Sequence, residues 1–571
     1  MDNEEIITVI YSIADLLDIK GEDFFKTRAY RLAAQALETL DEDITVLVEE
    51  ERIQEIQGIG KAIAQKITEL VQTGKLTYYE ELKKEVPESL LKILQIPGLG
   101  PKKVAAMYHK LGLTTVDEVQ QAAEQGNLRE LEGFGEITER NILRGIQLRR
   151  QTSGRFLLHR AYDDAMKYLE YMKKCTAIKQ VNIAGSLRRM KETIGDLDIL
   201  ASSTQPENVM TYFTKYQDID RVLLQGNTKT SVLLYDNVQV DLRVVEPKSY
   251  GAALQYFTGS KEHNVALRGL AIKQGYKLNE YGLFQKDNEK YVCGKDEHEL
   301  YDKLGLAYIE PELRENRGEI EAASSHALRS LVSMEDIKGD FHVHSQWSDG
   351  FDTLEDMVEQ AKTLGYEYIG STDHSQTLQI AHGLSEERVK KKQKAIEKMN
   401  KKHSDFTVLF STECDIKADG TLDYPDRILK LFDLVYIGVH SAFKMDEKDM
   451  TKRLISGMSN EHAHILAHPT GRMIGRRESV NLDMQQIFDA AKDTHTCLEI
   501  NAFPDRLDLN DIMAKQAKDR EVTLAIGTDS HSIDHLQYMK FGVATARRGW
   551  IEPKDILNTL SVKDIMKIIK G

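Results

Sequence analysis

Cysteine is scarce in this chain of 571 residues, which has four: Cys175, Cys293, Cys414 and Cys497. None of them forms a CxxC pair, so the sequence predicts no disulfide framework and suits a reducing compartment. No apolar run approaches the roughly 20 residues of a membrane helix, and the acidic start MDNEEII does not resemble a signal peptide. We therefore expect a cytoplasmic protein that does not bind a membrane.

Basic residues are outnumbered by acidic ones. The chain has 76 lysines and arginines and 91 aspartates and glutamates, which gives a net charge of −15. This balance argues against a uniformly basic coat for nucleic acid. It does not exclude nucleic acid, since backbone amides and small basic patches hold phosphates locally and clustered carboxylates can hold metal ions. The length predicts about three or four domains.

The pattern of apolar residues changes along the chain. Residues 1–150 have helical spacing, and short β-branched runs such as VNIAG, LDILA and VQVDLRVV begin near residue 155. Mixed segments return over 252–316, and residues 317–336 read as a partly helical connector. From 337 onward short apolar strands alternate with helical stretches, which favours a parallel sheet or an α/β barrel.

Three glycine turns punctuate the helical first part: QGIG at 57–60, PGLG at 97–100 and EGFG at 132–135. Each opens a helix, whose unpaired N–H groups and dipole attract phosphate, and glycine leaves no Cβ in the way. We predict helix-hairpin-helix elements that grip the DNA backbone; glycines that merely end helices are the alternative. The third turn, followed by Glu136, is the weakest copy. The predicted contacts are Gly58, Gly60, Lys61, Gly98, Gly100 and Lys102.

A group of carboxylates follows in the β-rich part. Asp196 and Asp198 lie two residues apart in GDLDIL, and Asp241 lies inside the apolar run VQVDLRVV. A carboxylate among strand residues is costly to bury unless it is paired or bound to metal. Three convergent carboxylates suit two Mg²⁺ or Mn²⁺ ions, which can promote attack of a 3′-hydroxyl on a triphosphate. Solvated acids on a surface strand are the alternative reading.

Residues 1–316 resemble the family X DNA polymerases, including the beta-like enzymes. The resemblance lies in four motifs in this order: G-S-x-R-R from Gly185, G-D-x-D from Gly195, Asp241, and YFTGS from Tyr256. The resemblance implies that Asp196, Asp198 and Asp241 are the catalytic, metal-binding aspartates. It also implies nucleotide contacts by Gly185, Ser186, Arg189, Gly195, Tyr256, Phe257, Gly259 and Asn264. Arg268 matches a minor-groove DNA contact. Lys261 stands where the beta-like enzymes have an acid and is assigned no contact.

Lys66 aligns with the lysine that forms a Schiff base in beta-like enzymes and removes a 5′-deoxyribose phosphate. Such a lysine acts as a nucleophile only if a free amine is available. The alternative is an ordinary solvated lysine on a helix, and the sequence leaves both readings open.

Histidines and acids cluster at strand ends after residue 337. In an α/β barrel the loops that follow the strands gather at one face, where the chemistry takes place. Imidazole with carboxylate suits Zn²⁺, Mn²⁺ or Fe²⁺, and nine ligands suffice for about three ions with bridging. The predicted ligands are His342, His344, Asp349, His374, Glu413, His440, His468, Asp529 and His531.

This second pattern resembles the PHP domain, named for polymerase and histidinol phosphatase, over residues 337–571. The resemblance implies a distorted (β/α)₇ barrel that hydrolyses phosphoesters. Arg472, Arg476 and Arg477 follow His468 closely. They either steer DNA phosphate towards the cluster or form a plain basic patch.

The predicted fold is multidomain, α and α/β. It comprises a helical DNA-end-binding domain with the first helix-hairpin-helix (1–80), a helical subdomain with the second and third turns (81–154) and a nucleotidyltransferase palm with a mixed β-sheet (155–247). A small α+β C-terminal polymerase subdomain (248–316), a linker (317–336) and the PHP barrel (337–571) follow.

The combined resemblance, to bacterial family X polymerases with a PHP domain, implies gap filling in base excision repair. It also implies metal-dependent 3′→5′ exonuclease or 3′-phosphodiesterase activity and incision at abasic sites. We expect a nucleoid-associated monomer that binds deoxynucleoside triphosphates, gapped or nicked duplex DNA, 3′ ends and other base-excision-repair proteins. One alternative is a PHP domain that is only a metal-stabilised structural or DNA-binding platform; another is a small-molecule phosphatase.

Overall fold

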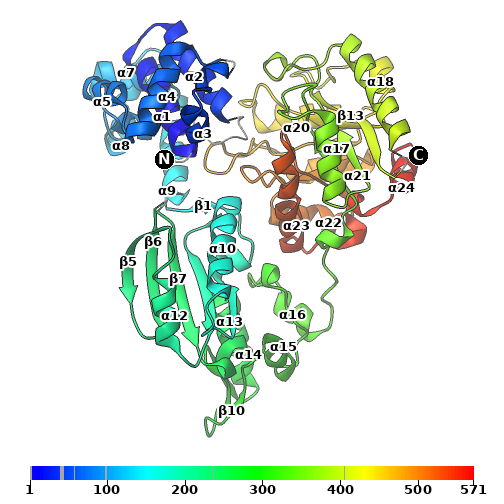
Figure 1. The fold of residues 1–571 in the computed structure, drawn as a ribbon. Coiled ribbons are helices and arrows are strands. Elements are labelled where there is room, and N and C mark those ends of the chain that lie inside the picture. Colours follow the sequence, from blue (N-terminus) through cyan, green and yellow to red (C-terminus); the bar gives the residue numbers. More distant parts are fainter. Residues whose placement is uncertain are drawn as a thin grey trace. The chain divides into compact units, whose positions relative to one another are not determined.

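The computed structural model describes residues 3–38, 44–56, 58–94, 96, 99–152, 154–235, 237–403 and 405–570. The chain divides into two compact units, one of residues 1–153 with 475–477 and one of residues 154–474 with 478–571. Figure 1 shows the elements of each unit. In the described part of the chain, no helix combines the length and hydrophobicity that crossing a bilayer requires.

The first unit is helical, as the apolar spacing predicts. Its described helices are α1 (Asn3–Lys20), α2 (Phe24–Glu38), α3 (Ile44–Glu49), α4 (Lys61–Thr73), α5 (Thr77–Glu85), α6 (Ser89–Leu94), α7 (Pro101–Leu111), α8 (Val116–Glu124) and α9 (Glu136–Thr152). One apolar core joins them, with Ile10 and Leu17 of α1 and Ile67 of α4 fully buried. Each helix buries one stripe of its surface in this core, which is how an amphipathic helix is stabilised in water.

The second unit begins with a five-stranded mixed sheet, which confirms the predicted sheet type. Its strands are β2 (Gln180–Ile183), β4 (Leu197–Ser202), β5 (Ile219–Gln225), β6 (Lys229–Leu234) and β7 (Gln239–Val245). Their order is β2-β4-β7-β6-β5, with β4 and β7 parallel and the other neighbours antiparallel. Helices α10 (Leu158–Lys173) and α12 (Pro206–Phe213) pack against it, and the short strands β1 (Phe156–Leu157) and β3 (Thr193–Ile194) pair beside it.

A small α+β part follows this sheet. It contains α13 (Tyr250–Thr258), α14 (Lys261–Lys273), the antiparallel strands β8 (Tyr276–Asn279), β9 (Gly282–Gln285) and β10 (Tyr291–Cys293), and α15 (Glu297–Lys303). The predicted connector contains α16 (Glu319–Ser324), whose Ile320 and Ala323 are buried in the core of this part. Val332 is buried in the core of the domain that comes next. Much of the connector is therefore packed rather than extended.

The last part is a parallel barrel, as predicted. Strands β11 (Gly339–Val343), β12 (Tyr368–Ser371), β13 (Thr407–Asp415), β14 (Leu434–Gly438), β15 (Ile465–Leu466), β16 (Cys497–Asn501) and β17 (Leu524–Gly527) pair in chain order. A parallel bridge from Val343 to Ser530 brings the first strand beside the last, so the sheet is nearly closed. The longer connecting helices are α17 (Leu354–Thr363), α18 (Glu386–Lys402), α20 (Glu447–Met458), α21 (Met484–Asp493), α22 (Asp511–Asp519) and α23 (Met539–Arg548).

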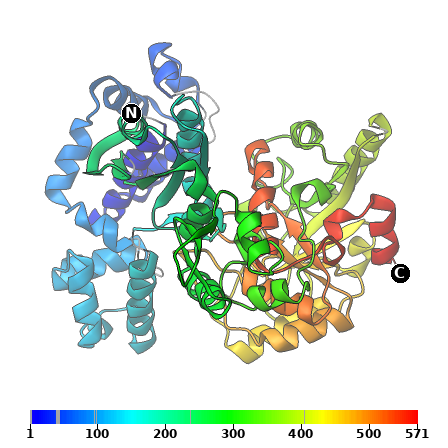
Figure 2. The same ribbon diagram turned by 90° about the horizontal axis from the view of Figure 1, so that it is seen from below.

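Two apolar layers hold the barrel together. One layer lies between strands and helices, and Figure 2 shows those helices, coloured green to red, around the strands. A second layer contains residues near the starts of the strands, including Tyr368, Leu434 and Ile465, and it packs against α24 (Val562–Lys570). Because this helix covers the amino ends of the strands, the carboxyl ends are left for polar side chains.

Candidate active sites

The three predicted aspartates of the five-stranded sheet lie together. Asp198 on β4 is the direct register partner of Asp241 on the parallel strand β7. Asp196 lies just before β4 begins, two residues from Asp198. One carboxylate oxygen from each of the three lies within 4.8 Å of the others. Adjacent parallel strands therefore place all three carboxylates at one end of the sheet.

The charges of this triad are poorly compensated. Burial, together with the charges of Asp196 and Asp241, raises the pKa of Asp198 to about 7. Burial alone would also raise the pKa of Asp241, but Lys229, with its Nζ 2.6 Å from Oδ2, and Gln239 hold it below its ordinary value. Mutual repulsion of this kind is relieved by divalent cations, which prefer carboxylate oxygen. The residues present fit a site for metal.

The turn before β4 is shaped around the same carboxylates. Gly185 has a φ of 62°, and a Cβ on it would lie 2.1 Å from Oδ2 of Asp198. Ser186 follows in the short helix α11 (Gly185–Arg188) and is half-buried. A Cβ on Gly195 would lie 3.2 Å from the guanidinium of Arg155. Glycine at 185 is thus required both by the backbone and by the close approach of Asp198.

Arg189 links this turn to the α13–α14 part. Its Nε lies 3.1 Å from Glu315, and its NH1 donates a hydrogen bond to the carbonyl of Thr258. Gly259 has a φ of 69°, and a Cβ there would lie 3.1 Å from NH1 of Arg189. The predicted triphosphate residue and the predicted sugar-side glycine are therefore in contact.

The other predicted residues near the nucleotide lie on α13 and α14. The rings of Tyr256 and Phe257 meet edge-on with centroids 5.1 Å apart. The Asn264 amide donates to the carbonyl of Tyr256 at 2.7 Å and accepts from Gln255 at 2.7 Å. Exposed Arg268 donates to the backbone carbonyl of Asn264 at 3.3 Å. The two contacts of Asn264 with α13 join the helices beside the YFTGS turn.

In the first unit, the central residues of the glycine turns, Ile59, Leu99 and Phe134, are buried in the common core. Gly60 and Gly100 are the N-caps of α4 and α7, and among the described residues a Cβ at either would meet nothing within 4 Å. Lys61 is exposed directly after Gly60, and Lys102 is exposed after Pro101, two residues beyond Gly100. The helix starts therefore carry open N–H groups and nearby positive charge. Gly98 of the second turn lies outside the described residues.

Lys66 lies on α4 beside an aromatic ring. Its Nζ is 4.8 Å from the ring centroid of Tyr78 and donates to the carbonyl of Ala62 at 3.4 Å. The ring of Tyr78 is in turn stacked on Tyr30. The lysine is thus held over an aromatic surface, and its role as a nucleophile stays a prediction.

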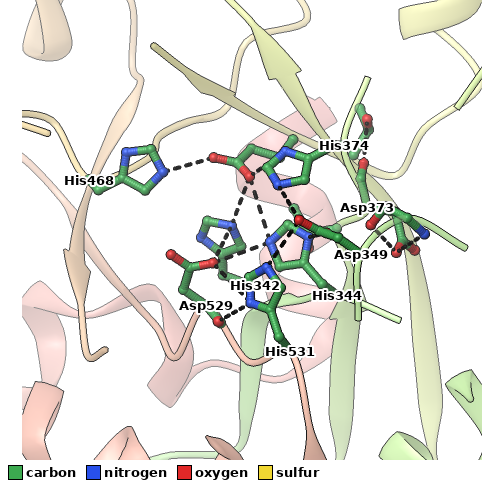
Figure 3. Close-up of polar contacts among 12 residues, drawn as sticks. His342, His344, Asp349, Asp373, His374, His468, Asp529 and His531 are labelled. Atoms are coloured by element: carbon green, nitrogen blue, oxygen red, sulfur yellow. Dashed lines mark hydrogen bonds and ion pairs between the residues drawn. The ribbon is translucent and has the colours of Figure 1, made fainter. Parts of the chain in front are cut away.

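All nine predicted ligands of the barrel lie at or just after the carboxyl ends of strands. Figure 3 labels seven of them, which are turned towards one centre: His342, His344, Asp349, His374, His468, Asp529 and His531. His342 and Glu413 lie within β11 and β13, and the others follow β11, β12, β14, β15 and β17. Two of them, His468 and Asp529, have positive φ values of 27° and 55°. Such strained backbone recurs at functional sites.

Glu413 lies at the centre of the cluster. Its carboxylate oxygens are 3.4 Å from His342, 3.6 Å from His344, 3.0 Å from His374, 3.0 Å from His440 and 2.9 Å from His468. Asp529 lies 3.3 Å from His344, and Asp349 lies 3.5 Å from His531. The nine residues thus form one connected cluster.

Three overlapping groups within this cluster have the spacing of metal ligands, with one ligand atom from each residue within 4.8 Å of the rest. The groups are His344 with Asp349, His374 and His531; His342 with His344 and Asp529; and His374 with Glu413 and His440. His468 joins them through Glu413. These groups are candidate sites for divalent metal ions.

Several atoms of the cluster are buried with no hydrogen-bond partner among the described residues: Nε2 of His342, both ring nitrogens of His344, Oδ1 of Asp349 and Nδ1 of His374. Unpaired buried polar atoms are costly, and metal coordination satisfies them. Burial also lowers the pKa of His374 to about 3 and that of His468 to about 4, which keeps both imidazoles in the neutral, metal-binding form. The donor set therefore fits a metal centre.

Two residues that orient these ligands, Glu499 and Asp415, were not predicted from the sequence. Buried Glu499 accepts from Nδ1 of His342 at 2.7 Å and from the backbone N–H of His468 at 2.6 Å. Asp415 lies 3.1 Å from Nδ1 of His440. Glu499 lies within the apolar strand CLEINA, the same signal that identified Asp241, so the sequence did contain the evidence for it.

Arg506 and Arg472 lie side by side near the cluster but differ in role. Arg506 is 3.3 Å from Oδ2 of Asp529. Arg472 donates to the carbonyls of Arg506 and Leu507 and lies 2.7 Å from Glu192, just before β3, the short strand that pairs with β1. The Arg472 guanidinium therefore ties this loop to the segment before β3, and steering of DNA by this residue stays a prediction.

Comparison with protein families gives four matches along the chain. A helix-hairpin-helix domain matches residues 1–76, and a SAM-like helix-hairpin-helix tandem matches residues 88–148. A DNA polymerase beta thumb matches residues 253–315, and a PHP domain matches residues 340–502. These matches cover both units of the structure.

Similar proteins agree with these matches. The DNA polymerase/3′-5′ exonuclease PolX of Bacillus subtilis is 39% identical over 572 residues, covering 100% of both chains. DNA polymerase lambda of Arabidopsis thaliana is 24% identical across 55% of this chain and 62% of its own, and that of Rattus norvegicus is 23% identical across 55% and 56%. The full-length likeness to the Bacillus protein means that the chain belongs to the family X DNA polymerases that carry a PHP domain.

Proposed function

We propose that this protein is a DNA polymerase that fills short gaps during base excision repair and a 3′→5′ exonuclease that trims the 3′ end. The observation that carries the proposal is the presence of two separate clusters in one member of this family: a carboxylate triad on a mixed sheet and nine metal-type ligands in a barrel. Its substrates would be gapped or nicked duplex DNA, and it would act as a monomer at the nucleoid, alongside other base-excision-repair proteins.

In the polymerase half, Asp196, Asp198 and Asp241 would hold two Mg²⁺ or Mn²⁺ ions. When bound, such ions activate a primer 3′-hydroxyl and neutralise the leaving pyrophosphate. Arg189 faces the same turn and would bind the triphosphate by charge-assisted hydrogen bonds. The remaining assignments, which rest on the family resemblance, are Gly185, Ser186 and Gly195 to the triphosphate, Tyr256, Phe257 and Gly259 to the sugar, Asn264 to the nucleotide in the nascent pair, and Arg268 to the minor groove.

The helix-hairpin-helix turns would position the DNA. Phosphate oxygens can approach the N–H groups at Gly60 and Gly100, since these positions carry no Cβ and have open space around them. Lys61 and Lys102 add positive charge that does not depend on base sequence. Gly58 and Gly98 are assigned to the same turns. Lys66, held over Tyr78, is the residue we assign to removal of a 5′-deoxyribose phosphate.

In the barrel, the nine ligands would hold about three divalent ions, either Zn²⁺, Mn²⁺ or Fe²⁺. When bound, these ions lower the pKa of a water molecule and neutralise the phosphoryl oxygens of a 3′-terminal phosphodiester. Arg506 beside Asp529 adds a positive charge at the edge of the cluster. The same site would remove blocked 3′ ends and incise abasic sites.

Two variants of the full chain test this division. On a labelled, gapped duplex, Asp241→Ala is expected to abolish extension while degradation of the 3′ end persists, and His344→Ala is expected to do the reverse. Unchanged degradation by a folded His344→Ala protein would instead support a barrel that is only a structural platform. Loss of both activities in Asp241→Ala would contradict the assignment of separate sites. Competition between p-nitrophenyl phosphate and DNA distinguishes a small-molecule phosphatase.

A further inference from the structure

The last residue of barrel helix α23 reaches the predicted nucleotide site. Arg548 is buried, with a side chain 4% exposed. Its NH1 donates to the backbone carbonyl of Arg189 at 2.7 Å and lies 3.0 Å from Glu315. Its NH2 lies 2.8 Å from Asp511, which Arg317 also contacts at 3.0 Å. These contacts lie within the second unit and join the barrel to the polymerase half.

Glu315 is shared between two guanidinium groups. The same oxygen, Oε1, lies 3.1 Å from Nε of Arg189 and 3.0 Å from NH1 of Arg548. Burial alone would raise the pKa of Glu315, but Arg548 and Arg189 together hold it below its ordinary value. The carboxylate is therefore ionised, and its negative charge is divided between the two arginines.

This sharing affects how Arg189 can bind an anion. If Arg189 were the sole partner of Glu315, the pair would be neutral and would attract a triphosphate weakly. Arg548 also pairs with Asp511, which Arg317 shares, so the connected network has three guanidinium groups and two carboxylates. It therefore carries a net positive charge at short range from the triphosphate turn. The hydrogen bond from Arg548 to the Arg189 carbonyl also fixes the backbone at that position.

We propose that Arg548, contributed by the PHP barrel, is a positioning residue for the polymerase site: it holds Glu315 and the Arg189 backbone so that the Arg189 guanidinium is available to the triphosphate of an incoming deoxynucleotide. The inference rests on the proposed polymerase function. It makes the barrel a structural part of the nucleotide site, apart from any nuclease activity of its own.

Arg547 provides a matched control on the same helix. It is half-buried, and it too forms interdomain contacts, with Glu312 at 2.7 Å, Glu310 at 3.5 Å and the carbonyl of Val332 at 3.2 Å. None of these partners is Arg189 or Glu315. A general weakening of the interface would therefore affect Arg547→Ala and Arg548→Ala alike, whereas loss of nucleotide positioning would affect Arg548→Ala alone.

The test measures single-nucleotide gap filling by the full chain. For Arg548→Ala we expect the KM for the deoxynucleotide to rise about tenfold, with kcat changed by less than about twofold, because a charged hydrogen-bond network is lost. Arg548→Lys should recover part of the change, and Arg547→Ala should match the wild type. The double variant Arg548→Ala with Glu315→Gln should bind the nucleotide better than Arg548→Ala, since the unshared charge is gone.

The possible outcomes distinguish a failure of this inference about Arg548 from a failure of the proposed polymerase function. Gap filling by the wild type with an unchanged KM in folded Arg548→Ala would overturn the inference and leave the proposed function intact. Equal rises in KM for Arg547→Ala and Arg548→Ala would also overturn it, because a common effect means interface stability alone. If the wild type itself extends no primer, the proposed function fails first.

Discussion

Lys229 on β6 forms a diagonal ion pair with Asp241 on the antiparallel neighbour β7, with 2.6 Å between Nζ and Oδ2. This pair lies at the polymerase triad, where Asp241 would otherwise be a buried carboxylate repelled by two others. We expect Lys229→Ala to slow primer extension by about tenfold, since residues that orient metal ligands typically contribute this much or more. The measurement is the single-turnover rate of nucleotide insertion at saturating metal.

Lys229→Arg should retain most of the rate, because it keeps the charge. Exposed Lys248, which pairs with Glu246 at 2.7 Å, is the matched control, and Lys248→Ala should extend primers normally. Wild-type insertion by Lys229→Ala would mean that the pair has no part in the reaction.

At Gly185, in the polymerase site, both the backbone conformation and the neighbouring atoms require glycine. A methyl group there would lie 2.1 Å from Oδ2 of Asp198, and the φ of 62° is unfavourable for other residues. We expect Gly185→Ala to lower extension by at least about a hundredfold, because a misplaced catalytic carboxylate is costly, with 3′-end degradation unchanged. Gly269→Ala, where a Cβ meets nothing within 4 Å among the described residues, is the control. Normal extension by Gly185→Ala would show that the turn relaxes without cost.

Glu499 supports two barrel ligands at once, and Glu499→Gln would weaken the acceptor of the His342 hydrogen bond. We expect the exonuclease rate and the bound metal content to fall together by about tenfold or more, with primer extension unaffected. Metal content is measured by elemental analysis after dialysis. Glu521, exposed and paired with Lys492, is the control in the same domain. Full metal content with full activity in Glu499→Gln would remove this residue from the site.

Ionisation of Glu297 makes the stability of the fold depend on pH. Burial alone would raise its pKa, but Arg314 and Arg188 lower it from 4.5 to about 2. The ionised form therefore stabilises the fold above pH 4.5, and this contribution is lost as the pH falls from 4.5 towards 2. We expect Glu297→Gln to reduce the free energy of unfolding at pH 7 by on the order of 3 kcal/mol, measured by urea unfolding.

The difference between wild type and Glu297→Gln should shrink as the pH is lowered from 5 to 3. Glu289, exposed and paired with Lys277, is the control, and Glu289→Gln should change little at any pH. A difference that stays constant over this range would mean that the loss does not come from ionisation of Glu297.

Much of the candidate barrel site could be predicted from sequence because the relevant patterns are local. Each ligand follows, or lies within, a short apolar segment, and parallel strands bring their carboxyl ends to one face. His342 and His344 illustrate this, since alternation along the chain at β11 and the bridge from β11 to Ser530, just after β17, place both beside Asp529. The glycine turns were predictable for the same reason, because a glycine and the helix after it are neighbours in sequence.

Contacts between residues that are far apart in the sequence could not be predicted from such local patterns. His342 and Glu499 are 157 positions apart, and Arg548 and Arg189 are 359 positions apart. No local pattern relates them, because their meeting depends on how strands order in a sheet and how helix α23 packs. The sequence by itself determined which residue types occupy strand ends and helix starts. Only the tertiary structure decided which charges share a partner, since that depends on packing between segments far apart in the chain.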